Sequence, residues 1–363
     1  MTFFQHRDAS LISTTKHYLT MRKTILSLLL LAVAATGFAQ TEKSQTVQGG
    51  GTGPCKAVVV GDASLPNFTI YRPKDLSAVD KLPILLYANG GCANSTVQMR
   101  FLLNEVASHG YMVVGIGPYE EEDPIENWKN VMKDMYPEGK NVVLANGEKI
   151  KAPTPAEVKK RQEEQQKRRQ AMMEARKNNP ASEAMRPRTY ARQLLEALDW
   201  LTDQNINPES EYCGKLDLCH VAAMGQSCGG AQVLAVSHDP RLTTCILLNS
   251  GIGDITMSGA GKSALETLHT PMLYIIGGPT DIAYANAAKD FANIKKVPVV
   301  MVNTPPDGHH GTFYEMYGGG YAVAVRKWLD WHLKGKVGES ALFLDTEYMH
   351  WKYPEWTVDR KNW

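Results

Sequence analysis

Short runs of consecutive apolar residues alternate with amphipathic stretches along most of the chain. The apolar runs are typical of strands covered on both faces, and apolar residues three and four apart are typical of helices packed on one side. The predicted strands are 57–60, 68–71, 84–88, 111–116, 220–224, 243–248, 272–276 and 297–302. The predicted helices are 97–109, 193–204, 232–238 and 321–333. This alternation predicts an α/β fold with a mostly parallel central sheet and helices on both faces, opened by an antiparallel pair of strands.

One long segment, residues 119–188, interrupts the alternation where a connection of a few residues is usual. It contains a predicted hairpin over 141–150 and a highly charged helix over 155–178. Thr154 and Glu157 have the spacing of a capping box at the start of that helix. Two interpretations stay open: a solvated helical insertion without chemistry, and a lid over the mouth of an active site.

The segment from Met21 to Ala39 has the composition of a secretory signal peptide. Basic residues precede a short apolar run, 25–35, and small residues favour cleavage before Gln40. The run is shorter than the about 20 residues that span a membrane, so cleavage is favoured over an uncleaved membrane anchor. We therefore expect a secreted or periplasmic protein in which residues 1–20 are a non-native upstream extension.

The rest of the chain is predicted to be one α/β domain, 55–345, with a flexible leader, 40–54, before it and an aromatic tail, 346–363, after it. The 363 residues are 43% hydrophobic and carry a formal net charge of +1, which is typical of a globular protein and gives no reason to expect nucleic acid as a partner. No further apolar stretch has the length of a membrane span. The six cysteines match no zinc pattern, so neither a metal nor a cofactor is expected. The oligomeric state stays open.

Residues 225–229 form a G-x-S-x-G motif between a predicted strand and a predicted helix. A sharp turn between a strand and a helix holds such a serine in a strained conformation, with its hydroxyl exposed at the carboxyl edge of the sheet. Gly225 and Gly229 are expected to leave room that a Cβ would fill. Ser227 is therefore the predicted nucleophile of a serine hydrolase.

A serine needs a base to take its proton and an acid to orient that base. In hydrolases built on such a sheet the order along the chain is serine, acid, histidine. Asp281 follows the strand 272–276, and His309 and His310 follow the strand 297–302. We predict Asp281 as the acid and favour His309 over His310 as the base.

Two other aspartates are weaker alternatives for the acid. Asp239 precedes a proline at the end of a helix, where a role in a turn explains it better, and Asp254 is the second alternative.

An oxyanion hole needs backbone N–H groups aimed at the developing negative charge. One donor is expected from Cys228, directly after the nucleophile, and the other from Gly91 or Cys92 in the loop after the strand 84–88. If both loops line one hole, Cys92 and Cys228 lie close enough for a disulfide. Cys213 and Cys219, which flank a turn, are a second possible pair.

The chain resembles the secreted α/β-hydrolases related to dienelactone hydrolases, chlorophyllases and cutinase-like polyesterases. The stretches that carry the resemblance are 89–92, 107–111, 225–230, 277–281 and 308–312. The resemblance implies an α/β-hydrolase fold with Ser227, Asp281 and His309 as nucleophile, acid and base. Two differences stand out: the compact polyesterases lack the charged insertion, and the oxyanion loop here lacks their aromatic clamp, which argues against a polyester substrate.

These observations favour a secreted or periplasmic carboxylic-ester hydrolase that works through an acyl-serine. Its expected substrate is an acyl group on a carbohydrate or another small ester. A peptidase or a polyester or lipid hydrolase on the same fold is the alternative, and a catalytically silent binding protein is the alternative from another class.

Overall fold

The computed structural model describes residues 43–121, 188–305 and 307–363, together with single residues and short pieces between 142 and 174. They all belong to the compact unit Glu42–Trp363. The expected upstream extension, the expected signal peptide and most of the charged insertion lie outside the described residues. Within the described ranges, no helix is both long and apolar enough to cross a membrane.

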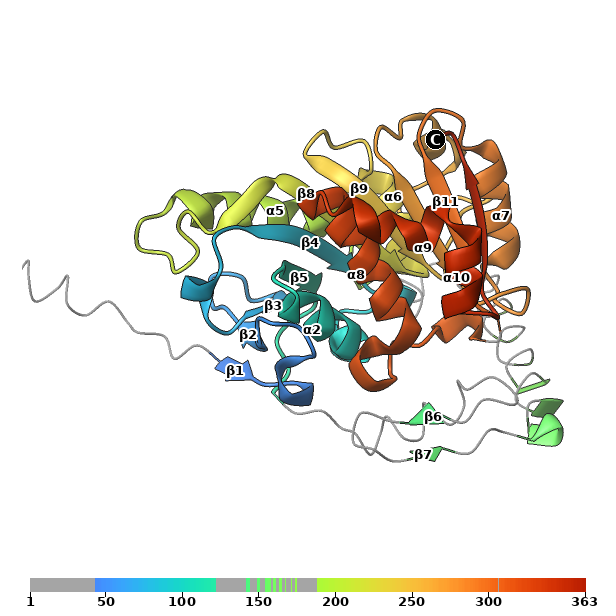
Figure 1. Ribbon diagram of the computed structural model, residues 1–363, viewed down its shortest axis with the longest axis horizontal. Helices are drawn as coiled ribbons and strands as arrows, with labels where there is room; N and C mark the ends of the chain where they lie inside the picture. Colours follow the sequence, from blue (N-terminus) through green and yellow to red (C-terminus); the bar gives the residue numbers. More distant parts are fainter. Residues whose placement is uncertain are drawn as a thin grey trace, which may run out of the picture. The chain divides into compact units, whose positions relative to one another are not determined.

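A 10-stranded sheet forms the centre of this unit, in the order β1-β2-β3-β5-β4-β8-β9-β10-β11-β12 (Figure 1). Its strands are β1 (Lys43–Gln45), β2 (Ala57–Gly61), β3 (Phe68–Pro73), β4 (Leu82–Ala88), β5 (Met112–Ile116), β8 (Leu216–Gln226), β9 (Leu242–Leu248), β10 (Met272–Ile276), β11 (Val299–Asn303) and β12 (Thr357–Lys361). Strands β5, β4, β8, β9, β10 and β11 are parallel to one another, whereas β1, β2, β3 and β12 pair antiparallel at the two sides. The mostly parallel sheet confirms the predicted fold class.

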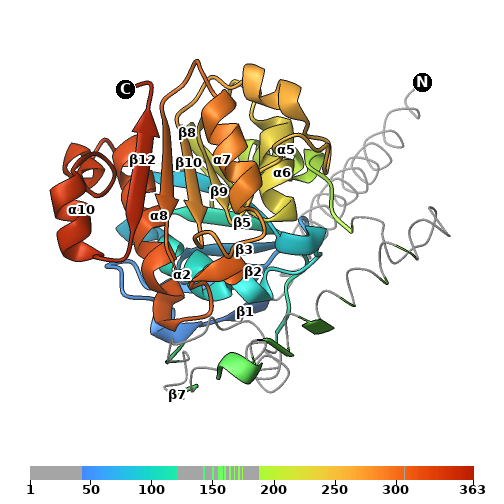
Figure 2. The same cartoon turned by 90° about the vertical axis from the view of Figure 1, so that its right-hand side faces the viewer.

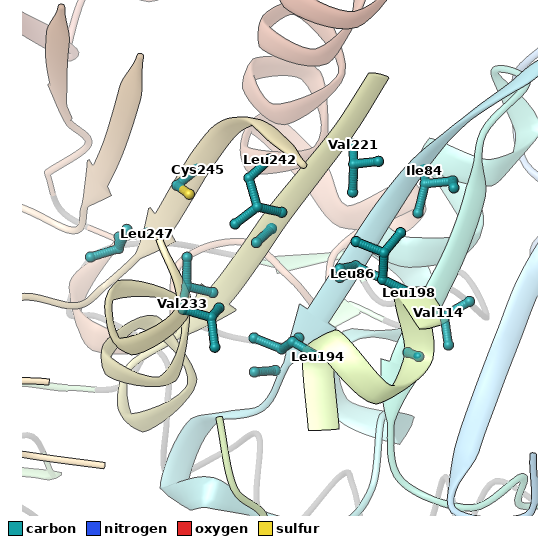
Figure 3. Close-up of a cluster of buried hydrophobic side chains, with 14 of the residues drawn as sticks. Ile84, Leu86, Val114, Leu194, Leu198, Val221, Val233, Leu242, Cys245 and Leu247 are labelled. Atoms are coloured by element: carbon teal, nitrogen blue, oxygen red, sulfur yellow. The ribbon is translucent and has the colours of Figure 1, made fainter. Parts of the chain in front are cut away.

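Helices cover both faces of the sheet (Figure 2). The longer ones are α2 (Arg100–Ser108), α5 (Arg192–Ile206), α6 (Cys228–Val236), α7 (Tyr284–Asn293) and α8 (Gly319–Lys334). Alternate residues of β4 point to opposite faces: Ile84 and Leu86 belong to the core under α5, α6 and α7, and Leu85 and Tyr87 to the core under α2 and α8. Figure 3 shows part of the first core, where side chains of β4, β8 and β9 pack against α5 and α6.

The chain changes direction across the sheet at β4. Helix α2 leads from β4 to β5 on one side, whereas α5 leads to β8 on the other side of β4. In open α/β sheets, ligands bind at the carboxyl ends of the strands where the strand order reverses in this way. The loops after β4 and β8 therefore flank the expected binding crevice.

Both ends of the predicted domain differ from expectation. In the segment expected to be a flexible leader, Lys43–Gln45 forms β1 on β2, and Val47 is buried with its carbonyl bonded to Asn104. In the segment expected to be an aromatic tail, α10 (Thr346–Lys352) is followed by β12, the edge strand beside β11 (Figure 2). Both strands are held mainly by backbone pairing, which leaves little trace in the pattern of apolar residues.

Two features expected within the insertion fall on described residues. Strands β6 (Val142–Val143) and β7 (Lys149–Ile150) pair antiparallel, which confirms the hairpin. Thr154 and Glu157 form the capping box, because the N–H of Thr154 donates to Glu157 Oε2 at 2.7 Å and the N–H of Glu157 donates to Thr154 Oγ1 at 3.4 Å.

Candidate active site

Ser227 lies in the sharp turn between β8 and α6. Its φ of 51° and ψ of −115° are strained for a residue with a Cβ. Two hydrogen bonds to the end of β9 and the loop after it hold the turn: the N–H of Ser227 donates to the carbonyl of Leu248 at 2.9 Å, and its carbonyl accepts from Ser250 Oγ at 2.6 Å. The backbone therefore has the strained conformation predicted from the motif.

The two glycines of the motif are required by close backbone contacts. A Cβ on Gly225 would lie 2.2 Å from the carbonyl oxygen of Gly229, and one on Gly229 would lie 2.1 Å from the carbonyl oxygen of Ala88. Both distances are far below van der Waals contact, and both contacts are with backbone atoms. The steric explanation given for the two glycines is confirmed.

The structure brings Ser227, His309 and Asp281 into one hydrogen-bonded chain. His309 Nε2 lies 3.0 Å from Ser227 Oγ, and His309 Nδ1 lies 2.7 Å from Asp281 Oδ1. The His309 side chain is 16% exposed and that of Asp281 is fully buried. A hydroxyl, an imidazole and a buried carboxylate in this order form the geometry in which a serine loses its proton to a histidine.

The environment of Asp281 keeps it ionised. Burial on its own would raise its pKa, but the hydrogen bond and charge of His309, the N–H of Ala283 and the amide of Asn249 together hold the pKa below its usual range. The N–H of Gly277 is a further donor to Asp281 Oδ2, at 3.1 Å. An ionised carboxylate stabilises an imidazolium at His309.

Asn249 is a residue of this site that the sequence interpretation missed. Its Nδ2 lies 2.8 Å from Asp281 Oδ2, 2.9 Å from the carbonyl oxygen of Gly308 and 3.1 Å from the hydroxyl of Tyr321. Asn249 directly follows β9, so its place at a strand end on the same edge as Asp281 and His309 was the available signal.

The two weaker alternatives for the acid pair with basic side chains instead. Asp239 Oδ2 accepts from Arg241 at 2.8 Å, and Asp254 forms an ion pair with Lys289. Of the three aspartates, Asp281 is the one that contacts His309.

His310 lies beside His309, with ring centroids 5.5 Å apart, and lines the cleft in front of Ser227. Burial, and to a smaller extent the neighbouring His309, lower the pKa of His310 to about 4. The cleft has a volume of about 280 Å³. Its wall includes Tyr87, Met99, Phe313, Gln98 and Gln226.

The loop after β4 and the start of α6 are covalently joined. Cys92 and Cys228 form a disulfide with a Cα–Cα distance of 5.3 Å, as hypothesised. The N–H of Cys228 is the first of helix α6, so it has no carbonyl partner within the helix. Gly91 lines the cleft. The second possible pair is not formed: Cys213 and Cys219 are free and exposed.

The doubly covered parallel sheet with this site at its carboxyl edge defines an α/β-hydrolase. The family model described as "Platelet-activating factor acetylhydrolase, isoform II" matches residues 52–304, and the chain belongs to that family. The match includes Ser227 and Asp281 and ends before His309. Members of the family are serine esterases, so the predicted class of enzyme, a serine hydrolase acting on carboxylic esters, is confirmed. No curated protein matches the chain.

Proposed function

We propose that the protein hydrolyses short-chain carboxylic esters through an acyl-enzyme on Ser227. The observation that carries the proposal is the chain of hydrogen bonds from Ser227 Oγ through His309 to the buried Asp281. Ser227 is the nucleophile, His309 the general base and acid, and Asp281 the residue that orients and stabilises the imidazolium.

In the proposed reaction, Ser227 Oγ attacks the ester carbonyl while its proton passes to His309 Nε2. The tetrahedral oxyanion is stabilised by the N–H of Cys228 and by an N–H of the loop after β4, from Gly91 or Cys92. His309 then protonates the leaving alcohol. Water, deprotonated by the same histidine, hydrolyses the acyl-serine and releases the acid.

The size and lining of the cleft favour a small acyl group. Its volume of about 280 Å³ is at the lower end of the range of roughly 300–1,000 Å³ that is usual for small-molecule sites. Met99 and Phe313 offer apolar contact, and Gln98 and His310 offer uncharged hydrogen-bonding groups. An acetyl or similarly short ester of a polar alcohol, such as an acylated carbohydrate, suits this combination.

A second candidate substrate follows from the family. The description of the matching family names an acetylhydrolase of platelet-activating factor, and this favours an acetyl ester on a phospholipid. The two candidates share the acetyl group and differ in the alcohol. A comparison of acetylated sugars with an acetylated phospholipid therefore separates them.

We further propose that the protein is exported, to the periplasm or to the outside of the cell. The basic and apolar segments within 21–39 and the Cys92–Cys228 disulfide both support this, because disulfides persist in oxidising compartments. The mass and amino-terminal sequence of the mature protein test it, with cleavage before Gln40 as the expected result.

The central experiment measures kcat/KM on p-nitrophenyl esters of increasing acyl length, with wild type and Ser227→Ala. The expected result is a maximum at acetyl or propionyl and a fall of at least about 10³-fold in the variant. Activity unchanged by Ser227→Ala would overturn the proposed nucleophile. Cleavage of peptides without cleavage of esters would assign a peptidase, and turnover of neither would leave a binding protein.

A further inference from the structure

The Cys92–Cys228 disulfide connects the two backbone segments that carry the proposed oxyanion donors. Cys228 directly follows Ser227 and opens α6, and Cys92 ends the short 3-10 turn Gly90–Cys92 after β4. The two cysteines are 136 residues apart in the chain. Cys92 is 1% exposed, whereas Cys228 is partly exposed, so the bond is packed on the side of Cys92 and open to a reagent on the side of Cys228.

In the loop after β4, the backbone is strained at Cys92, one of the two residues that form the disulfide. Gly91 has a φ of 62°, which glycine adopts freely, but the next residue, Cys92, has a φ of 47°. A positive φ at a residue with a Cβ costs about 1–2 kcal/mol and persists only where other contacts hold it. The direction of the N–H groups at residues 91 and 92 depends on these two dihedral angles.

The surroundings of the disulfide provide that support. Ser258 places its hydroxyl oxygen 3.2 Å from Cys92 Sγ and 3.0 Å from Cys228 Sγ, so a third loop covers both sulfurs. In the same loop, Gly90 packs so closely on Gln226 that a Cβ there would lie 1.7 Å from Gln226 Oε1. The loop after β4 is thus fixed against β8 and α6 by one covalent bond and by close packing.

We propose that the Cys92–Cys228 disulfide is a positioning element of the oxyanion hole, so that ester hydrolysis depends on its oxidation state. This proposal rests on the proposed function. The bond holds Cys92 in its left-handed backbone conformation and fixes one oxyanion donor relative to the other. Without it, the loop relaxes toward a conformation that is usual for a non-glycine residue, and its N–H group turns away from the substrate oxygen.

The redox step involves thiol–disulfide exchange. A dithiol such as dithiothreitol attacks one sulfur as its thiolate, forms a mixed disulfide and then closes to its own cyclic disulfide. Cys92 and Cys228 each gain one electron and one proton and become thiols. Reoxidation by a disulfide reagent reverses the step.

The test compares the oxidised protein, the protein reduced with dithiothreitol, and the double variant Cys92→Ser/Cys228→Ser. Steady-state kinetics on p-nitrophenyl acetate should show kcat about 10- to 100-fold lower in the last two, with KM changed less than about threefold, because an oxyanion donor acts mainly in the transition state. Labelling of Ser227 by a fluorophosphonate, whose phosphoryl oxygen enters the same hole, should slow by a similar factor. Circular dichroism establishes that each sample is folded at the assay temperature.

Two controls separate this proposal from a general effect of cysteines. Cys213→Ser/Cys219→Ser removes two exposed free thiols and should keep both the wild-type kcat and its loss on reduction. Reoxidation of the reduced protein should restore the original kcat. A kcat within twofold of the oxidised protein, with two new thiols established by titration, would overturn the proposal while leaving the function of Ser227 untouched. A fluorophosphonate bound at a residue other than Ser227 would overturn the proposed function instead.

Discussion

The side chain of Asn249 donates a hydrogen bond to Asp281 across 2.8 Å, from Nδ2 to Oδ2. The same Nδ2 lies 2.9 Å from the carbonyl oxygen of Gly308, the residue before His309. One amide thus connects the end of β9 to the loop of the proposed acid and to the loop of the proposed base. Asn249 has a φ of 48°, a conformation that asparagine tolerates better than most residues.

Replacement of Asn249 by glycine should lower kcat about tenfold and leave KM within about twofold. Glycine accepts the positive φ, so the change removes the amide without straining the backbone. Asp281 then loses one donor, and the imidazole is less well oriented. Steady-state kinetics measure the effect. Asn362→Gly, at another asparagine with a positive φ, of 63°, is the matched control and should keep wild-type kcat.

The two neighbouring histidines should respond very differently to alanine substitution. His309→Ala removes the base that contacts Ser227 and should lower kcat by at least about 10³-fold. His310→Ala should lower kcat less than about tenfold. His310 lines the cleft, but it takes no part in the proposed transfer of the Ser227 proton. With a pKa of about 4, His310 adds no ionisation to the pH–rate profile above pH 5. An equal loss in both variants would contradict the assignment of His309.

A methyl group at Gly229 should prevent the turn around Ser227 from forming. Its Cβ would lie 2.1 Å from the carbonyl oxygen of Ala88, the last residue of β4, whose backbone is held by its pairing with β8. Gly229→Ala should therefore lower the free energy of unfolding by about 3 kcal/mol or more. Denaturant unfolding measures the change. Gly338→Ala, where a Cβ meets nothing within 4 Å, should change it by less than about 0.5 kcal/mol.

Asp290 should make the protein less stable as the pH rises through 6. Burial raises the pKa of this carboxyl to about 6, although the N–H groups of Ile252 and Gly253 donate to it at 2.8 Å. Because the pKa in the folded protein is raised, the contribution is fully present below about pH 4 and is lost as the pH rises through 6. The contribution of Asp290 to the free energy of unfolding follows from the rise of its pKa from 3.8 to about 6, and it reaches about 3 kcal/mol.

Unfolding by urea at pH 4.5 and pH 7.5, in wild type and Asp290→Asn, isolates this contribution. Wild type should lose more stability than Asp290→Asn between pH 4.5 and pH 7.5. The other groups titrate equally in both proteins, so this difference isolates Asp290. Glu209→Gln removes an exposed carboxylate that does not contribute to the raised pKa of Asp290, and it should leave that dependence in place. A pH dependence of Asp290→Asn identical to that of wild type would show that Asp290 does not titrate in this range.

The sequence predicted the parts of the fold whose signal is local. The apolar strands are continuous runs, and in a parallel sheet their carboxyl ends must lie along one edge. This alone predicts that Ser227, Asp281 and His309 lie close together. The hypothesis of a Cys92–Cys228 disulfide has the same basis, because both cysteines follow strands that end at this edge. The G-x-S-x-G motif predicted the strained turn because its two glycines have a steric reason that is independent of the rest of the chain.

Other parts depend on contacts that a linear pattern does not record. Strand β12 has an exposed, mostly polar sequence and exists because its backbone pairs with β11. Helix α7 was not predicted, since its buried positions are an alanine, Ala287, and the acidic Asp290 rather than large apolar residues. Asn249 was missed for a related reason: a polar residue after a strand is common, and its role arises only from the three loops that meet around it.

The disulfide between Cys92 and Cys228 also changes what a protease can do to this protein. A single cut of the chain anywhere between these two residues, including within the long charged segment, produces two polypeptides that remain joined by a covalent bond. One piece carries the loop after β4, and the other carries Ser227 and all that follows it. After a cut outside the strands, β4 and β8 stay paired as neighbours in the sheet, and the nicked molecule migrates as one species until a reductant separates it into two.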